Sequence, residues 1–179
     1  DVSGAVTVPA SGITLNTVAG AGSALNNTGN VAIADGGAIT VANNFNIMGP
    51  IVPAGAATFT LTNNLTYGGT AFNVGANTLT LAGTGSLSNT NAVVLNDAAS
   101  VLDFTAAATV SKVESGNDAA KIDAGAAGTI STLSFTGNNG VNIDFSTAST
   151  FTVTNAFSLP TGGTSVLLVS GSAAGTLTG

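Results

Sequence analysis

A short phrase of alternating apolar and polar residues returns along this chain at a nearly constant interval of about 20 residues. The segment 39–45, ITVANNF, matches the segment 59–65, FTLTNNL, in character at every position. The segment 79–81, LTL, follows after an equal interval, and the segment 151–157, FTVTNAF, repeats the phrase later. Repeats of this length are typical of solenoids, whose stacked units bury together a face that one unit could not bury alone.

Two further sets of positions recur at the same interval or at one residue more. One set is apolar and consists of Val93, Val113, Leu133 and Val153. The other places an aspartate between two apolar neighbours, in Leu102-Asp103-Phe104, Ile122-Asp123-Ala124 and Ile143-Asp144-Phe145. This alternation indicates strands with one buried face. We therefore expect an all-β, parallel β-helix (β-solenoid) of roughly eight or nine coils, each rising about 4.8 Å along a rod on the order of 40 Å long.

The repeat predicts a single domain over residues 1–179, less regular over 1–37 and regular over 38–179. A pilin-like β-sandwich, with residues 1–15 as a donated strand, is the alternative fold. The regular spacing argues against that alternative, because a sandwich has no reason to place matching inward residues at a fixed interval.

Two local segments carry their own expectations. Pro50 and Pro53 interrupt the repeat, and because proline lacks a backbone donor they favour a bend or a protruding loop over a central strand. The run 166–169, VLLV, lies between glycine- and serine-rich flanks and is expected to form one buried strand.

The composition excludes much chemistry. The chain has two lysines, Lys112 and Lys121, against eight acidic residues, with a net charge of −6 and no arginine, histidine or cysteine. It therefore lacks an imidazole base, a thiolate, a disulfide and a Cys/His zinc site, and it lacks the basic footprint that nucleic acid requires. Paired acids can hydrolyse glycosides, but two lysines cannot furnish a cleft for anionic sugars. We expect no enzymatic activity, no nucleic-acid partner and no membrane-spanning segment.

Two motifs carry a family resemblance. The segment 77–85, NTLTLAGTG, and the tail 162–171, GGTSVLLVSG, followed by 175–179, GTLTG, resemble the passenger domains of bacterial autotransporters. The resemblance implies a right-handed β-helix that is exported to the bacterial surface, where such domains often serve as adhesin stalks. No outer-membrane barrel follows Gly179, so the chain would be a processed or truncated piece, or a separate protein sharing the solenoid style.

The three aspartates Asp103, Asp123 and Asp144 form a candidate calcium site. Alternation points them outward, where stacking could bring the carboxylates within about 5 Å of one another. Oxygen ligands suit Ca²⁺, and like charges at this distance oppose each other unless a cation or a proton intervenes. The competing interpretation is an offset in register that separates the three in solvent. Apart from this calcium, no cofactor is expected.

Threonines form another outward column, Thr40, Thr60 and Thr80, with Thr58, Thr62 and Thr78 nearby. Flat threonine arrays on β-helices resemble those of some ice-binding proteins, and that function would need a second regular column on the same face. Threonine also favours any exposed strand, where stacked hydroxyl groups stabilise pairing. Both interpretations remain open at this stage.

The two ends of the solenoid are candidate assembly surfaces. Val6 and Val8 lie in an apolar segment near the start, and Leu177 lies in a segment without any charge near the end. Open edges offer unpaired backbone groups to another chain, so either end could join a second subunit head to tail or by strand donation. Continuation into a longer polypeptide would explain the same features.

Together these features predict a non-enzymatic, extracellular structural protein of the adhesin type or a component of a surface assembly, with a host or surface ligand as partner. A fibre or pilus subunit is the alternative function, and an ice-binding protein is the minor alternative. The sequence does not name the adhesion target, because a surface of Thr, Asn, Ser and Gly differs little from ordinary solvated strands.

Overall fold

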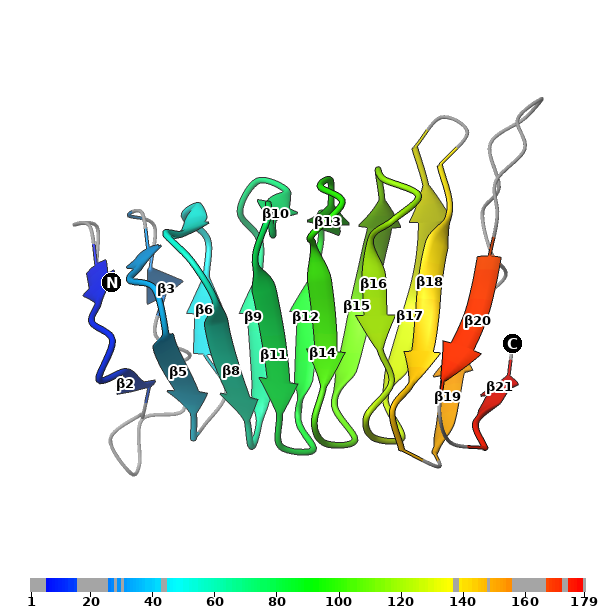
Figure 1. Cartoon of the computed structure of the whole chain (residues 1–179). Helices are drawn as coiled ribbons and strands as arrows, with labels where there is room; N and C mark the ends of the chain where they lie inside the picture. The colour runs from blue at the N-terminus through cyan, green and yellow to red at the C-terminus, as the bar shows by residue number, and fades with distance from the viewer. Residues whose placement is uncertain are drawn as a thin grey trace.

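The computed structural model describes residues 6–15, 26–27, 29, 31–42, 45–136, 139–147, 149–155, 167–171 and 174–178. Over these residues the chain forms short β-strands joined by turns and bends, without a helix, and hence without a helix that could cross a membrane. Every strand pair is parallel, and the strands stand side by side in a long row (Figure 1). The fold is a parallel β-solenoid, and the β-sandwich alternative is wrong because its sheets would be antiparallel.

The strands form three sheets that run along the rod. The eight-stranded sheet contains, in order, β2 (Ile13–Leu15), β5 (Gly37–Val41), β8 (Ala57–Leu61), β11 (Thr78–Ala82), β14 (Val101–Phe104), β16 (Lys121–Asp123), β18 (Val141–Phe145) and β20 (Leu167–Gly171). The three-stranded sheet contains β1 (Val6–Val8), β4 (Val31–Ile33) and β7 (Ile51–Pro53).

The remaining strands make up a ten-stranded sheet. Its main path contains β21 (Thr176–Thr178), β19 (Thr150–Val153), β17 (Thr129–Phe135), β15 (Thr109–Ser115), β12 (Ser86–Asn89), β9 (Asn64–Tyr67), β6 (Phe45–Ile47) and β3 (Asn26–Asn27). The short strands β10 (Phe72–Asn73) and β13 (Val93–Leu95) lie off this path, and β13 joins the sheet through β15.

Coil length averages about 22 residues, slightly more than the repeat predicts. The central strands from β5 to β18 follow one another at intervals close to this average. The solenoid makes about 6 turns, so the expectation of eight or nine coils is wrong, because the coils are longer than the repeat, especially at the two ends. The coils at the two ends are longer, because Ile13 of β2 pairs with Ile39 and Ile143 of β18 pairs with Val169. The additional residues lie between the strands in the sequence, and the strands themselves remain in register.

The apolar column that the sequence predicts is correct over three of its four members. Val93 lies opposite Val113, and Val113 lies opposite Leu133, all three fully buried. Val153 is also buried, but it lies opposite Ile130. Its assignment to this column is wrong because the coil from β17 to β19 is longer than the repeat, which shifts the pairing away from a constant interval.

Inward side chains from the strands fill the tube with one apolar core. Aromatic rings pack against one another inside it: the rings of Phe59 and Phe72 are stacked at 5.8 Å, and those of Phe104 and Phe151 meet edge to face at 5.1 Å. Each buried side chain of this size contributes about 1.5 to 3 kcal/mol, so the core supplies the stability that a single coil lacks.

Two local expectations need correction. Residues Ile51–Pro53 form β7 and not a protruding loop, and Pro53 is tolerated because β7 is the outer strand of its sheet. The run 166–169 lies partly outside the described residues. Leu168 and Val169 belong to β20 as expected, but they are 55% and 51% exposed and therefore not buried, since β20 is the outer strand of the eight-stranded sheet.

Candidate functional site

The outward face of the eight-stranded sheet carries a continuous row of side chains, one from each strand after β2. Inward residues of β8 and β18 are buried while the residues between them are partly exposed, which is the alternation expected of a sheet with one wet face. The row consists of Ala38, Thr58, Thr80, Asp103, Asp123, Asp144 and Ser170. It changes from small and hydroxyl side chains on β5, β8 and β11 to carboxylates on β14, β16 and β18, and it ends at Ser170 on β20.

The structure brings the three predicted aspartates together. Asp103 lies opposite Asp123, and Asp123 lies opposite Asp144, in adjacent strands about 4.8 Å apart. The interpretation in which a register offset separates them is therefore wrong. Sequence periodicity located these residues correctly, because the coils from β14 to β18 keep the interval of the repeat almost unchanged.

A lysine that the sequence did not assign to this site neutralises part of the column. Lys121 Nζ lies 3.0 Å from Asp123 Oδ2 and 2.7 Å from Asp144 Oδ2. The hydrogen bond to Asp144, followed by the interactions with Asp123, raises the pKa of Lys121 above its usual value despite partial burial. The position of Lys121 two residues before Asp123 on the same strand is the sequence signal that would have revealed this pairing.

Hydroxyl groups from neighbouring coils donate to the same carboxylates. Thr80 Oγ1 donates to Asp103 at 3.3 Å, and Ser146 Oγ donates to Asp123 at 2.9 Å. Burial, followed by the charge of Asp123, raises the pKa of Asp103, while the hydrogen bond from Thr80 and the charge of Lys121 lower it less. The net effect of these surroundings is to disfavour the ionised form of Asp103.

The calcium hypothesis requires more ligands than this column offers. The described residues contain no group of three or more acidic, histidine or cysteine side chains arranged to hold a metal ion. Lys121 lies where a cation would neutralise Asp123 and Asp144. Ca²⁺ usually takes six to eight oxygen ligands. Calcium binding by these residues stays a prediction, and the competition between Lys121 and Ca²⁺ makes it testable.

The threonine column differs from the one the sequence predicts. Thr40 lies opposite Thr60, but Thr60 lies opposite Ala82, and Thr80 lies opposite Thr58. The coil from β8 to β11 is slightly longer than the repeat and moves Thr80 into the neighbouring row. The two rows on this face then change to alanine and aspartate, so they do not provide the second regular threonine column that ice binding would need.

A longer hydroxyl row lies on the ten-stranded sheet, where a constant interval could not reveal it. Its members are separated by coils of unequal length, and Thr178 Oγ1 donates to Thr152 Oγ1 at 3.0 Å. The row consists of Ser86, Thr109, Thr129, Thr152 and Thr178. These hydroxyl groups support strand pairing along this face.

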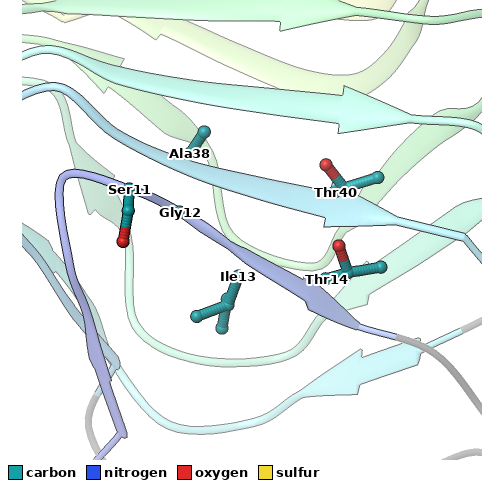
Figure 2. Close-up of a pocket in the computed structure, with 6 residues that line it drawn as sticks. All are labelled: Ser11, Gly12, Ile13, Thr14, Ala38 and Thr40. Carbon is teal, nitrogen blue, oxygen red and sulfur yellow. The ribbon is translucent and has the colours of Figure 1, made fainter.

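A hollow of about 180 Å³ lies beside β2 (Figure 2). Ser11, Gly12, Ile13 and Thr14 line it from β2 and the residues just before it, and Ala38 and Thr40 of β5 line it from the adjacent strand. Gly12 has φ +78°, and a Cβ there would lie 2.8 Å from the carbonyl oxygen of Ala38, so this position requires glycine. The hollow is smaller than the usual pocket for a small molecule, which is about 300 Å³ or more.

The predicted assembly residues lie on outer strands. Val6 and Val8 belong to β1, where Val8 is buried and Val6 is partly buried against the core. Leu177 belongs to β21, lies opposite Phe151 and also packs against the core. The larger exposed apolar side chains at this end are Leu168 and Val169 of β20, which the sequence analysis took to be buried.

No known protein family, no curated protein and no solved structure matches this chain.

Proposed function

We propose that the chain is a non-enzymatic, extracellular structural protein of the adhesin type, which displays a long polar surface on a stiff rod. The observation that supports this proposal is the eight-stranded parallel sheet, whose backbone ladder continues from β2 to β20 over one apolar core. Parallel ladders with a packed interior resist bending, and a row of polar side chains at intervals of about 4.8 Å offers many equivalent contacts.

The resemblance to autotransporter passengers supports a location on the bacterial surface. The motif 77–85 forms β11 and the turn that follows, and this turn needs glycine. Gly83 has φ +81°, and a Cβ there would collide with the carbonyl oxygen of Leu61 in the preceding coil. The motif therefore encodes close stacking of coils, which is the property shared with passenger domains.

The outward row described above is the surface we propose for adhesion. Its hydroxyl groups suit hydrogen bonding to glycan or protein ligands, and its carboxylates favour ligands that carry positive charge. Single contacts of this kind are weak, but repeated contacts along a rod add up when many chains are displayed together.

Adhesion can be measured with beads that carry the chain through one end and flow over layers of cultured cells. We expect native beads to be retained more strongly than beads carrying a Leu133→Asp variant, whose core is disrupted. A Thr58→Lys, Thr60→Lys double variant should reduce retention, whereas Ser88→Lys on the ten-stranded sheet should not. Equal retention of native and Leu133→Asp beads would contradict an adhesive role.

A fibre subunit is the second candidate. Leu168 and Val169 are adjacent, large, apolar and more than half exposed on the outer strand β20. Exposed apolar groups on an unpaired strand edge favour association with another strand. Electron microscopy of the native chain at neutral pH would show filaments with a regular axial repeat for this function, and dispersed short rods otherwise.

A further inference from the structure

The two outer strands of the eight-stranded sheet have complementary surfaces. In the described part of the chain, β2 and β20 each pair with a neighbour on one side only. All pairs in this sheet are parallel, so a second copy displaced along the rod axis would present its β2 to β20 in the direction the sheet requires. This is the head-to-tail geometry of an open, heterologous assembly.

The exposed residues of β20 continue rows that are already present in the sheet. Val169 lies opposite Ile143, which is fully buried, so Val169 extends an inward apolar column. Val169 itself is exposed, because β20 is the outer strand of the sheet. Leu168 lies opposite the partly exposed Asn142 and therefore belongs to an outward row. Ser170 lies opposite Asp144 and hydrogen-bonds to Asn142 Oδ1 at 3.0 Å.

The segment around β2 offers a matching surface. Ile13 lies opposite the buried Ile39 and begins an inward column, and it is only partly buried. Thr14 lies opposite Thr40 on the outward face. Gly12 has no side chain, and the hollow of about 180 Å³ opens there, so this segment lacks an outward side chain where β20 has an exposed leucine (Figure 2).

We propose that β20 of one copy pairs in parallel with β2 of the next copy, with Leu168 opposite Gly12, Val169 opposite Ile13 and Ser170 opposite Thr14. Leu168 then fills the hollow, and Val169 and Ile13 cover each other. Ser170 and Thr14 extend the outward row of hydroxyl groups. This interface rests on the fibre-forming version of the proposed function and identifies its partner as a second copy of this chain.

The register follows from the alternation of the two strands. A shift by one residue would pair the inward-facing Val169 with an outward-facing residue of β2, and the outward-facing Leu168 with an inward-facing residue. All three matches would then be lost. A shift by two residues in one direction would place Val169 opposite the exposed Ser11 and Gly171 opposite Ile13. A shift by two in the other direction would keep apolar pairs, Leu167 with Ile13 and Val169 with Leu15, but would place Leu168 opposite Thr14. Among these registers, the proposed one places apolar residues on apolar residues and hydroxyl groups on hydroxyl groups.

Sedimentation velocity of the 17.0 kDa chain, from about 10 µM to 1 mM, tests the association. We expect the native chain to form a concentration-dependent series of oligomers. Leu168→Glu blocks one end and Ala38→Glu blocks the hollow, and each variant alone should remain monomeric. Thr58→Glu, in the same outward row as Ala38 but in the interior of the sheet, is the matched control and should associate as the native chain does.

Mixing the two blocked variants distinguishes head-to-tail pairing from other association. Each variant keeps one intact end, so an equimolar mixture should form a dimer and nothing larger. If Ala38→Glu lowers the melting temperature, Ser11→Glu replaces it, because Ser11 is exposed and also lines the hollow. A native chain that stays monomeric, or blocked variants that associate like the control, would overturn the proposal.

Cysteine cross-linking tests the register, since the chain has no cysteine of its own. Thr14→Cys with Ser170→Cys should give disulfide-linked multimers on mild oxidation, because paired strands place opposite Cα atoms about 5 Å apart. Thr14→Cys with Leu168→Cys should give fewer, because the pair is offset by two residues. Equal yields would refute the register.

Bead adhesion uses isolated, tethered chains, so its failure and the failure of this interface are distinguishable.

Discussion

The hydroxyl group of Tyr67 accepts a hydrogen bond from the backbone N–H of Ile51 at 3.3 Å inside the core. Ile51 begins β7, the last strand of the three-stranded sheet, and Tyr67 is a fully buried residue of the following coil. Pro53, also in β7, has no N–H to satisfy. The Tyr67 hydroxyl group accepts from one edge position, and Pro53 has no donor at another. Neither position therefore leaves an unpaired N–H at this edge, although no further strand pairs there.

Tyr67→Phe should lower the free energy of unfolding by about 1 to 3 kcal/mol, because it leaves the buried N–H of Ile51 without an acceptor while keeping the ring. Thermal denaturation would measure the loss. Amide hydrogen exchange should show faster exchange at Ile51, while amides of β15 remain protected. Unchanged exchange at Ile51 would mean that another acceptor serves this N–H.

Lys121→Met should destabilise the fold at neutral pH by about 1 kcal/mol, because Asp103, Asp123 and Asp144 then face one another without a cation. For a chain of this size, this is a fall of roughly 2 to 4 °C in melting temperature. Because the pKa of Lys121 is raised by folding, its contribution is present below the ordinary lysine value of 10.5 and is lost as the pH rises through the folded pKa.

The same variant tests calcium binding. We expect Ca²⁺ to leave the melting temperature of the native chain unchanged and to raise that of Lys121→Met, because the metal then replaces the missing ammonium group. Lys112→Met is the matched control, since Lys112 donates to the carbonyl oxygen of Thr90 and forms no ion pair with the column. A calcium effect on the native chain would show that Lys121 does not occupy the site.

Asp103→Asn should stabilise the fold at pH 7 and have little effect in acid. The pKa of Asp103 is raised, chiefly by burial, so the protonated form is favoured in the folded state. The stability linked to this proton is fully present below the ordinary value of 3.8 and is lost as the pH rises through the folded pKa. The side-chain amide of this variant does not titrate, so it removes this dependence of stability on pH. Its oxygen can still accept the hydrogen bond from Thr80. Melting temperatures of both proteins from acid to neutral pH would test this, and a constant difference would contradict it.

Leu133→Asp should cost about 4 kcal/mol or more, because it places a charge in a fully buried column next to Val113. Thr132→Asp is the matched control: it adds the same charge one residue earlier, on a partly exposed position opposite Lys112. Circular dichroism during thermal unfolding should show loss of the cooperative transition in the first variant alone. If the Leu133→Asp variant melts as the native chain does, the column of Val93, Val113 and Leu133 is not closed to water.

The repeat was sufficient to predict the fold class, because alternation of inward and outward residues survives in strands of the central coils such as β5, β8 and β18. The pairing of single residues was predictable only where the coil length happened to match the interval of the repeat, as for Asp103, Asp123 and Asp144. The predicted pairing failed for Thr80 and Val153, because the coils there are longer than the repeat and the paired residues are more than 20 positions apart. Turn length depends on local contacts such as those of Asn89, a buried side chain that donates to the carbonyl oxygens of Asn91 and Lys112.

The candidate site was only partly accessible from the sequence for a similar reason. The carboxylates were found from their spacing, but the role of Lys121 depends on where a long side chain reaches across two strands. The hollow at Gly12 and the exposure of Leu168 could not be predicted, because both depend on which strands lie at the outside of the sheet.

The break between β7 and β10 has a mechanical consequence. Backbone hydrogen bonds of a solenoid run along the rod, so tension between its two ends loads them directly. The coils before this junction are joined by three ladders, β4 with β7, β5 with β8 and β6 with β9, but β7 and β10 do not pair, so only β8 with β11 and β9 with β12 join the coils across it. Under tension along the rod, this junction should therefore open more readily than the one before it, which has a third ladder to break.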